Sequence, residues 1–154
     1  MHLKLLRVFL GFSAVAWGAS IFGVFLSWPA AIEALQGLGS QAIAYDRMLD
    51  YWLRMAAGAF TLVGGLFFLL MLQPEKYRVI IPWFGSLMLV EGLILLVHGV
   101  RLQLPPLPFY ADTAACLLGG AGILWTSMRA DYSSHSEAEP DAPPNRRPPR
   151  GVQR

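Results

Sequence analysis

The sequence predicts an all-α, membrane-embedded four-helix bundle followed by a disordered C-terminal tail. Of the 154 residues, 55% are hydrophobic and only 14% are charged, whereas soluble domains carry about 25% charged residues. The apolar residues gather in long runs that end at proline, aromatic or charged residues. A helix needs about 20 mostly apolar residues to cross the hydrocarbon core. We therefore expect a transmembrane domain over 1–128 and a tail over 129–154.

Four runs are long enough to be spans. They cover the ranges 5–26, 51–72, 79–100 and 109–128. The apolar run that opens the chain is longer than the core of a cleaved signal peptide, which is about 7–15 residues. We therefore expect an uncleaved first helix. Trp and Tyr cluster at the span ends, as an aromatic belt does, and Trp17 is the exception because it lies mid-span.

Lysine and arginine predict the orientation of the spans. The N-terminus, the connection after the second span and the tail hold nine of the twelve basic residues, and the opposite side holds Arg47, Arg54 and Arg101. The positive-inside rule then places both termini in the cytoplasm. We expect a multi-pass protein of the inner (cytoplasmic) membrane.

The connection between the first two spans is too long for a simple turn. Residues 30–36 are good helix formers, and Gly37 and Gly39 follow them. We expect a short interfacial helix over the mouth of the bundle, which acts either as a lid or as filler.

The tail is rich in proline, serine and charge, and it has too few apolar residues to order itself. It is basic but has no fold to present to nucleic acid, so lipid headgroups are the better partner. The single cysteine, Cys116, excludes an intrachain disulfide and a cysteine-based metal site. We interpret it as a small buried hydrophobe.

Small residues predict the helix contacts, because they let two helix backbones approach closely, and this close packing stabilises helix association in lipid. Each span has one stripe of them: Ala14 and Gly18; Ala57, Thr61 and Gly65; Gly85, Gly92 and Gly99; Ala111, Ala115, Gly119 and Gly122. These stripes favour a compact four-helix bundle, and the alternative is that one stripe forms a homodimer interface.

Glu91 is the strongest functional candidate, because it lies near the middle of the third span. A carboxylate at mid-bilayer costs roughly 2.5–3.5 kcal/mol and usually faces a partner or water. His98 lies within roughly 20° of Glu91 around the helix and about 10 Å further along it. The pair resembles a minimal proton relay.

Other polar residues are expected at the same outer end of the bundle. Asp50 and Arg54 are four residues apart and can pair, and Arg101 can pair with Asp112. The candidate functional cluster is therefore Glu91, His98, Arg54, Asp50, Arg101 and Asp112. The alternative is that the ion pairs only fix helix register and that His98 only packs.

The sequence assigns no catalytic residue, no cofactor and no metal ligand. A tight motif such as His-x-x-x-His is missing, and so is a glycine-rich phosphate loop. Ser86 lies on the cytoplasmic half of its span and cannot meet His98 in a triad.

Several segments resemble the BphX-like family of small four-helix bacterial membrane proteins. They are 45–60 (Tyr-Asp-Arg-Met-Leu-Asp-Tyr-Trp-Leu-Arg-Met-Ala-Ala-Gly-Ala-Phe), 89–92 (Leu-Val-Glu-Gly), 98–99 (His-Gly) and 108–112 (Pro-Phe-Tyr-Ala-Asp). The resemblance covers roughly 5–128 and excludes the tail. It implies a bacterial membrane protein without an assigned activity, and it transfers no site residues.

Our leading expectation is a non-enzymatic membrane protein that binds a small partner, a lipid or another subunit through the outer-leaflet polar cluster. The first alternative is a small proton-coupled transporter or permeation unit that uses Glu91 and His98. The second is a membrane enzyme that uses Glu91, His98 and Asp112. The expected partners are the lipid bilayer and either a second copy or another membrane protein, but not nucleic acid.

Overall fold

The computed structural model describes residues 2–130, and it is all-helical over that range. The predicted disordered tail, 129–154, lies almost wholly outside the described residues. Six helical segments follow one another without a strand between residues 2 and 130: α1 His2–Gly18, α2 Ile21–Phe25, α3 Trp28–Gly37, α4 Arg47–Leu72, α5 Ile81–Arg101 and α6 Pro106–Arg129.

The predicted spans correspond to the long helices, with ends shifted by a few residues. The first predicted span is interrupted at Ala19 and Ser20, so that α1 and α2 follow each other as one bent rod. Three stretches in the described part are long and apolar enough to cross a membrane: His2–Phe25, Arg47–Leu72 and Ile81–Arg101. Helix α6 is not among them, so a fourth crossing stays a prediction.

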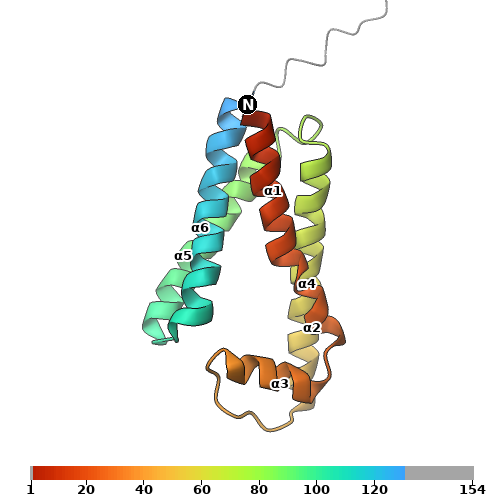
Figure 1. Ribbon diagram of the computed structural model, residues 1–154, viewed down its shortest axis with the longest axis vertical. Helices are drawn as coiled ribbons and strands as arrows, with labels where there is room; N and C mark the ends of the chain where they lie inside the picture. The colour runs from red at the N-terminus through yellow and green to blue at the C-terminus, as the bar shows by residue number, and fades with distance from the viewer. Residues whose placement is uncertain (1, 131–154) are drawn as a thin grey trace, which may run out of the picture.

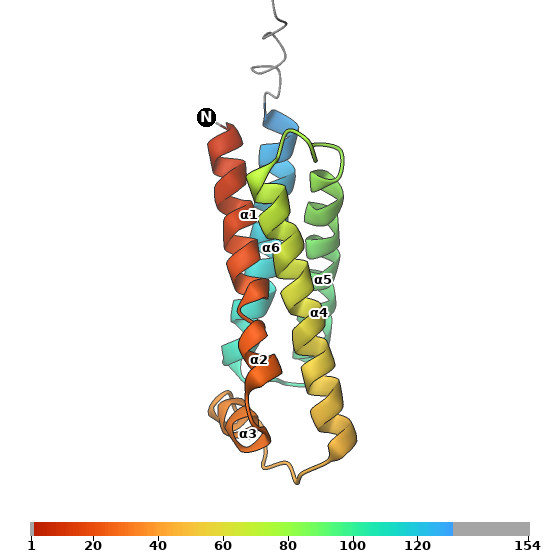
Figure 2. The same cartoon turned by 90° about the vertical axis from the view of Figure 1, so that its right-hand side faces the viewer.

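The helices form two pairs that meet at one end and diverge at the other. Helices α5 and α6 form one pair, α4 packs against α1 and α2 in the second, and α1 joins the pairs by also packing on α6. The pairs separate towards the far end, where α3 lies across the opening (Figure 1). The turned view shows the long rods side by side, with α3 at one end of them (Figure 2). The start of α1 and the end of α6 lie at the other end.

The glycine stripe of the third predicted span forms the contact between α5 and α6. All three glycines are buried. A Cβ added to Gly85 would lie 3.2 Å from the Gly120 carbonyl oxygen, and one added to Gly92 would lie 2.8 Å from Leu117 Cγ. A Cβ added to Gly99 would overlap the Phe109 ring. The stripe is therefore an intramolecular seam, as the bundle interpretation predicted.

The seam of α4 lies one residue away from its predicted position. An added Cβ on Gly64 would lie 2.6 Å from Gly18 Cα, whereas one on Gly65 would meet open space. The assignment of Gly65 to this seam was wrong, because Gly64 takes the place opposite Gly18. Ala57 does contact the neighbouring rod, because its Cβ lies beside Gly23 of α2.

The predicted helix between the first two spans is present as α3. It follows Ser27, whose backbone is extended, and Pro29 lies in its first turn. Gly39 has a φ of +101° and its Cα faces the Pro105 ring so closely that an added Cβ would lie 2.7 Å from Pro105 Cγ. This contact ties the chain after α3 to the loop between α5 and α6.

The outer faces of the long helices are apolar and exposed. Side chains such as Phe22, Leu62, Leu87 and Leu118 are among many large hydrophobic residues on these faces. The buried core is small by comparison and is centred on residues such as Phe67. Soluble monomers rarely expose apolar surface on this scale, which is consistent with a membrane protein.

Candidate binding cavity

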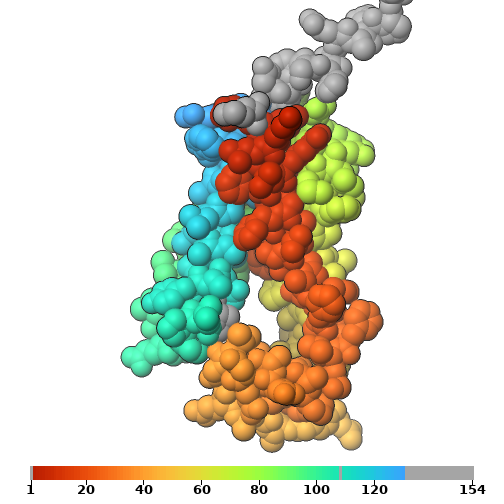
Figure 3. Space-filling view, viewed as in Figure 1, coloured from red at the N-terminus to blue at the C-terminus, as the bar shows by residue number. Residues whose placement is uncertain are grey.

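A cavity of about 260 Å³ lies where the two helix pairs diverge. Helices α1, α4, α5 and α6 all contribute to it, together with the break after α1. It is lined by Ala16, Trp17, Ser20, Phe60, Glu91, Leu95, Asp112, Ala115 and Cys116. The space-filling view shows the opening between the α5–α6 side and the α2–α4 side, with α3 beyond it (Figure 3).

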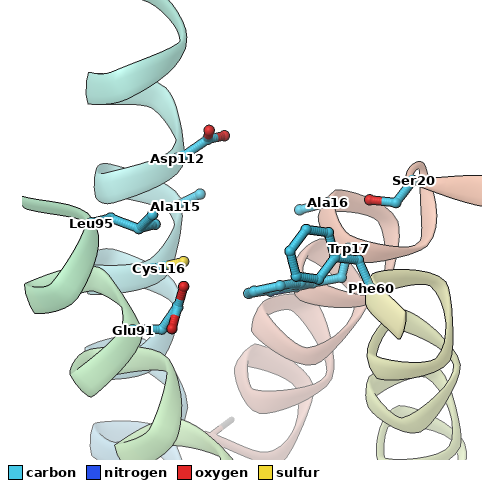
Figure 4. A pocket seen from close by; sticks show the side chains of 9 residues that line it. All are labelled: Ala16, Trp17, Ser20, Phe60, Glu91, Leu95, Asp112, Ala115 and Cys116. Atoms are coloured by element: carbon cyan, nitrogen blue, oxygen red, sulfur yellow. The ribbon is translucent and has the colours of Figure 1, made fainter. Parts of the chain in front are cut away.

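One wall of the cavity carries two carboxylates. Glu91 is half-buried on α5, and Asp112 is exposed on the first part of α6. The buried thiol of Cys116, one turn after Asp112, lies beside Glu91 (Figure 4). The close approach of Gly92 to Leu117 holds the two helices together at this level. The fold therefore brings acidic groups from two helices onto one surface.

The opposite wall is aromatic. The Trp17 and Phe60 rings pack edge to face, with centroids 5.2 Å apart and planes at 71°. They lie across the opening from Glu91 and Asp112, and the Ser20 side chain lies near them at the break after α1 (Figure 4). The cavity thus places two aromatic rings opposite two carboxylates, and no basic residue is among its lining residues.

A second, more apolar cavity of about 410 Å³ shares part of the same walls. Trp17, Phe60 and Glu91 line both cavities. The second cavity is otherwise lined by Ala59, Val63, Phe67, Phe84, Leu87, Met88 and Val90. Glu91 and the two rings therefore lie between the cavity that holds the two carboxylates and a more apolar one.

The structure confirms that Asp50 and Arg54 pair, but it places them away from the cavity. Their side chains meet at 3.0 Å between Arg54 Nη2 and Asp50 Oδ1. Arg54 Nη1 also donates a 2.7 Å hydrogen bond to the Val24 carbonyl oxygen. Because that carbonyl is at the end of α2, Arg54 caps the helix and does not reach Glu91.

His98 and Arg101 are exposed and do not line the cavity. His98 follows Glu91 by seven residues, which is about two turns further along α5. Within residues 2–130, Arg101 and Asp112 do not form the predicted ion pair. Of the predicted cluster, the fold brings only Glu91 and Asp112 to one cavity.

Sequence reasoning missed Trp17, Phe60, Ser20 and Cys116 as cavity residues. Trp17 carried a signal, since it is the tryptophan that lies outside the aromatic belts. Phe60 carried none, because phenylalanine is common in apolar helices, and Cys116 was interpreted only as a core residue. Although Glu91, Asp112 and Cys116 have ligating atoms, the described residues contain no group of three such side chains that could hold a metal ion.

Comparison with known proteins identified no match for this chain. No family model, no curated protein and no solved structure matches the chain, and the resemblance to the BphX-like family therefore remains a prediction.

Proposed function

We propose that this chain is a multi-pass membrane protein that binds a small molecule in the cavity between its two helix pairs. The observation that carries the proposal is the cavity itself, with two carboxylates facing two aromatic rings inside an otherwise apolar helical protein. Ligand sites are typically apolar concavities with a few convergent polar groups. Ionisable groups inside a membrane segment usually mark a functional site.

Membrane insertion is supported by the three long apolar helices and their exposed apolar faces. The start of α1 and the end of α6 lie at the same end of the protein, which supports a fourth crossing by α6 (Figure 1). The basic residues Lys4, Arg7, Lys76 and Arg78 belong to that end. The positive-inside rule favours a cytoplasmic position for it, and the family resemblance favours the inner membrane of a bacterium.

Binding of a ligand, without proton transfer or a reaction, explains the cavity better than a proton relay does. The relay needs Glu91 and His98 on one path, whereas His98 does not line the cavity with Glu91. The transporter and enzyme alternatives remain predictions that the cavity does not specifically favour.

The proposal can be tested by filling the cavity without changing its charge. Ala115 lines the cavity, whereas Ala111, one turn earlier on the same helix, is exposed and does not. We expect wild type in lipid nanodiscs to bind at least one of three small aromatic probes: benzyltrimethylammonium, its neutral isostere neopentylbenzene, or phenylacetate. Ala115→Phe should abolish binding measured by calorimetry, and Ala111→Phe should preserve it. Binding that survives Ala115→Phe, or no binding of any probe by wild type, would contradict the proposal.

A further inference from the structure

We infer that the ligand is an organic cation with an apolar body, such as a quaternary or protonated amine. The charged end would lie between Glu91 and Asp112, and the apolar end would extend into the neighbouring cavity. This inference rests on the proposed function and names the chemical class of its ligand.

The charge of the cavity argues for a cation. Glu91 and Asp112 are its charged lining residues. Arg54, which could have neutralised Glu91, is already held by Asp50 and by the Val24 carbonyl oxygen. Coulombic attraction strengthens as the surroundings become less polar. A cation beside the half-buried Glu91 would therefore gain more than at an exposed carboxylate, and it would offset the cost of keeping that carboxylate in the membrane.

The aromatic wall argues for an organic cation over a metal ion. A cation held over the face of Trp, Tyr or Phe is attracted by the ring, and aromatic cages recognise quaternary ammonium groups in this way. Trp17 and Phe60 place two aromatic rings opposite the carboxylates (Figure 4). Hard metal ions instead require several oxygen ligands, and the described residues hold no cluster of three metal-binding side chains.

The second cavity argues for an apolar body on the ligand. It continues from the shared residues Trp17, Phe60 and Glu91 onto aliphatic and aromatic side chains, including Phe67, Phe84 and Leu87. The Phe67 and Phe84 rings pack edge to face with centroids 5.4 Å apart. A molecule with its charge near Glu91 can thus bury a hydrocarbon portion without leaving the same pair of walls.

The experiment separates the effect of charge from the effect of shape. Benzyltrimethylammonium and neopentylbenzene differ in one atom, nitrogen against carbon, and therefore in charge but hardly in shape. We expect wild type in nanodiscs to bind the cation at least tenfold more tightly than the neutral isostere, with binding of phenylacetate weaker still. Glu91→Gln should reduce that preference at least tenfold and Asp112→Asn at least threefold, while both variants retain binding of the neutral isostere.

Glu33→Gln is the matched control, because Glu33 is an exposed carboxylate on α3 that does not line the cavity. It should leave the preference unchanged. Equal binding of the cation and its neutral isostere by wild type would overturn the charge inference but leave the proposed cavity function intact. A preference for phenylacetate would overturn the inference in the same way. Failure of all three probes would contradict the proposed function as well. The comparison within wild type remains decisive if a variant fails to fold.

Discussion

The guanidinium of Arg54 holds the carbonyl oxygen of Val24 at 2.7 Å, and this contact joins α4 to the end of α2. Helix ends leave carbonyl groups without partners inside the helix. Arg54 satisfies one of them while its other nitrogen pairs with Asp50. A residue that sequence analysis placed in a functional cluster therefore fastens the bent rod α1–α2 to its neighbour.

Replacing Arg54 by methionine should destabilise the protein without changing the cavity. Hydrogen bonds to charged groups contribute about 1.5–3 kcal/mol to the stability of soluble proteins. Interhelical hydrogen bonds in membranes contribute about 0.6 kcal/mol on average. We expect Arg54→Met to lower the free energy of unfolding by about 1–2 kcal/mol, measured by thermal or denaturant unfolding in detergent. Arg101→Met is the control, since Arg101 is exposed and should tolerate the change. Equal losses in both variants would show that the Val24 contact contributes nothing.

Two adjacent glycines on α4 should respond in opposite ways to alanine. Gly64→Ala places a methyl group against the backbone of Gly18, where neither chain can give way without separating the helices. Overpacking of this kind typically costs about 1–3 kcal/mol. Gly65→Ala places the methyl group in open space and should be neutral or stabilising by up to about 1 kcal/mol, because alanine favours helix. Unfolding of the two variants in one detergent tests the register of this seam, and the reverse order would refute it.

Gly39→Ala should loosen the connection across the open end of the protein. The φ of +101° is unfavourable for alanine, and the new methyl group would meet the Pro105 ring. We expect a loss of stability on the order of 1–2 kcal/mol from the backbone alone. Adding Pro105→Ala should recover only the part due to the steric clash. Gly37→Ala, where a Cβ meets nothing within 4 Å, should be nearly neutral. If the Gly37 and Gly39 variants unfold alike, the close approach to Pro105 has no energetic consequence.

Site-directed labelling can count the membrane crossings. In a Cys116→Ala background, single cysteines at Lys4, Lys76 and Arg129 should react with an impermeant maleimide only in inside-out vesicles. A cysteine at Gln36, in α3, should react only in intact spheroplasts. Labelling of Arg129→Cys from the same side as Gln36→Cys would exclude a fourth crossing by α6 and leave three.

Helix positions were predictable from sequence because long apolar runs and their proline or charged ends are local signals. The break at Ala19 and Ser20 was not, since the run remains apolar through it and no proline marks it. The choice between Gly64 and Gly65 depends on helix rotation, which a pair of adjacent glycines leaves open. The glycine stripe of the third span could be predicted, because a spacing of seven residues places all three glycines on one face of the helix.

Two of the six residues predicted for the candidate site line the cavity. Depth in the bundle brings Glu91 and Asp112 together, and depth can be counted along the sequence. The divergence of the helix pairs cannot be predicted from sequence positions. His98 is exposed, although the helical period predicts that it shares a face with Glu91. The side chain of Arg54 donates a hydrogen bond to the Val24 carbonyl oxygen. A backbone partner of this kind cannot be predicted from the pattern of side chains. Trp17 became a wall of the cavity because a residue on another helix, Phe60, packs against it.

The divergence of the two helix pairs has a consequence for how a ligand would arrive. The opening between them faces sideways, across the long axis of the protein (Figure 3). With the long helices spanning a bilayer, that side is bathed by acyl chains, so an amphipathic cation would enter from the lipid phase. The concentration that governs occupancy would then be the one dissolved in the membrane. Apparent affinities measured against the aqueous concentration should rise with each methylene that improves partitioning, even where the methylene touches no protein atom.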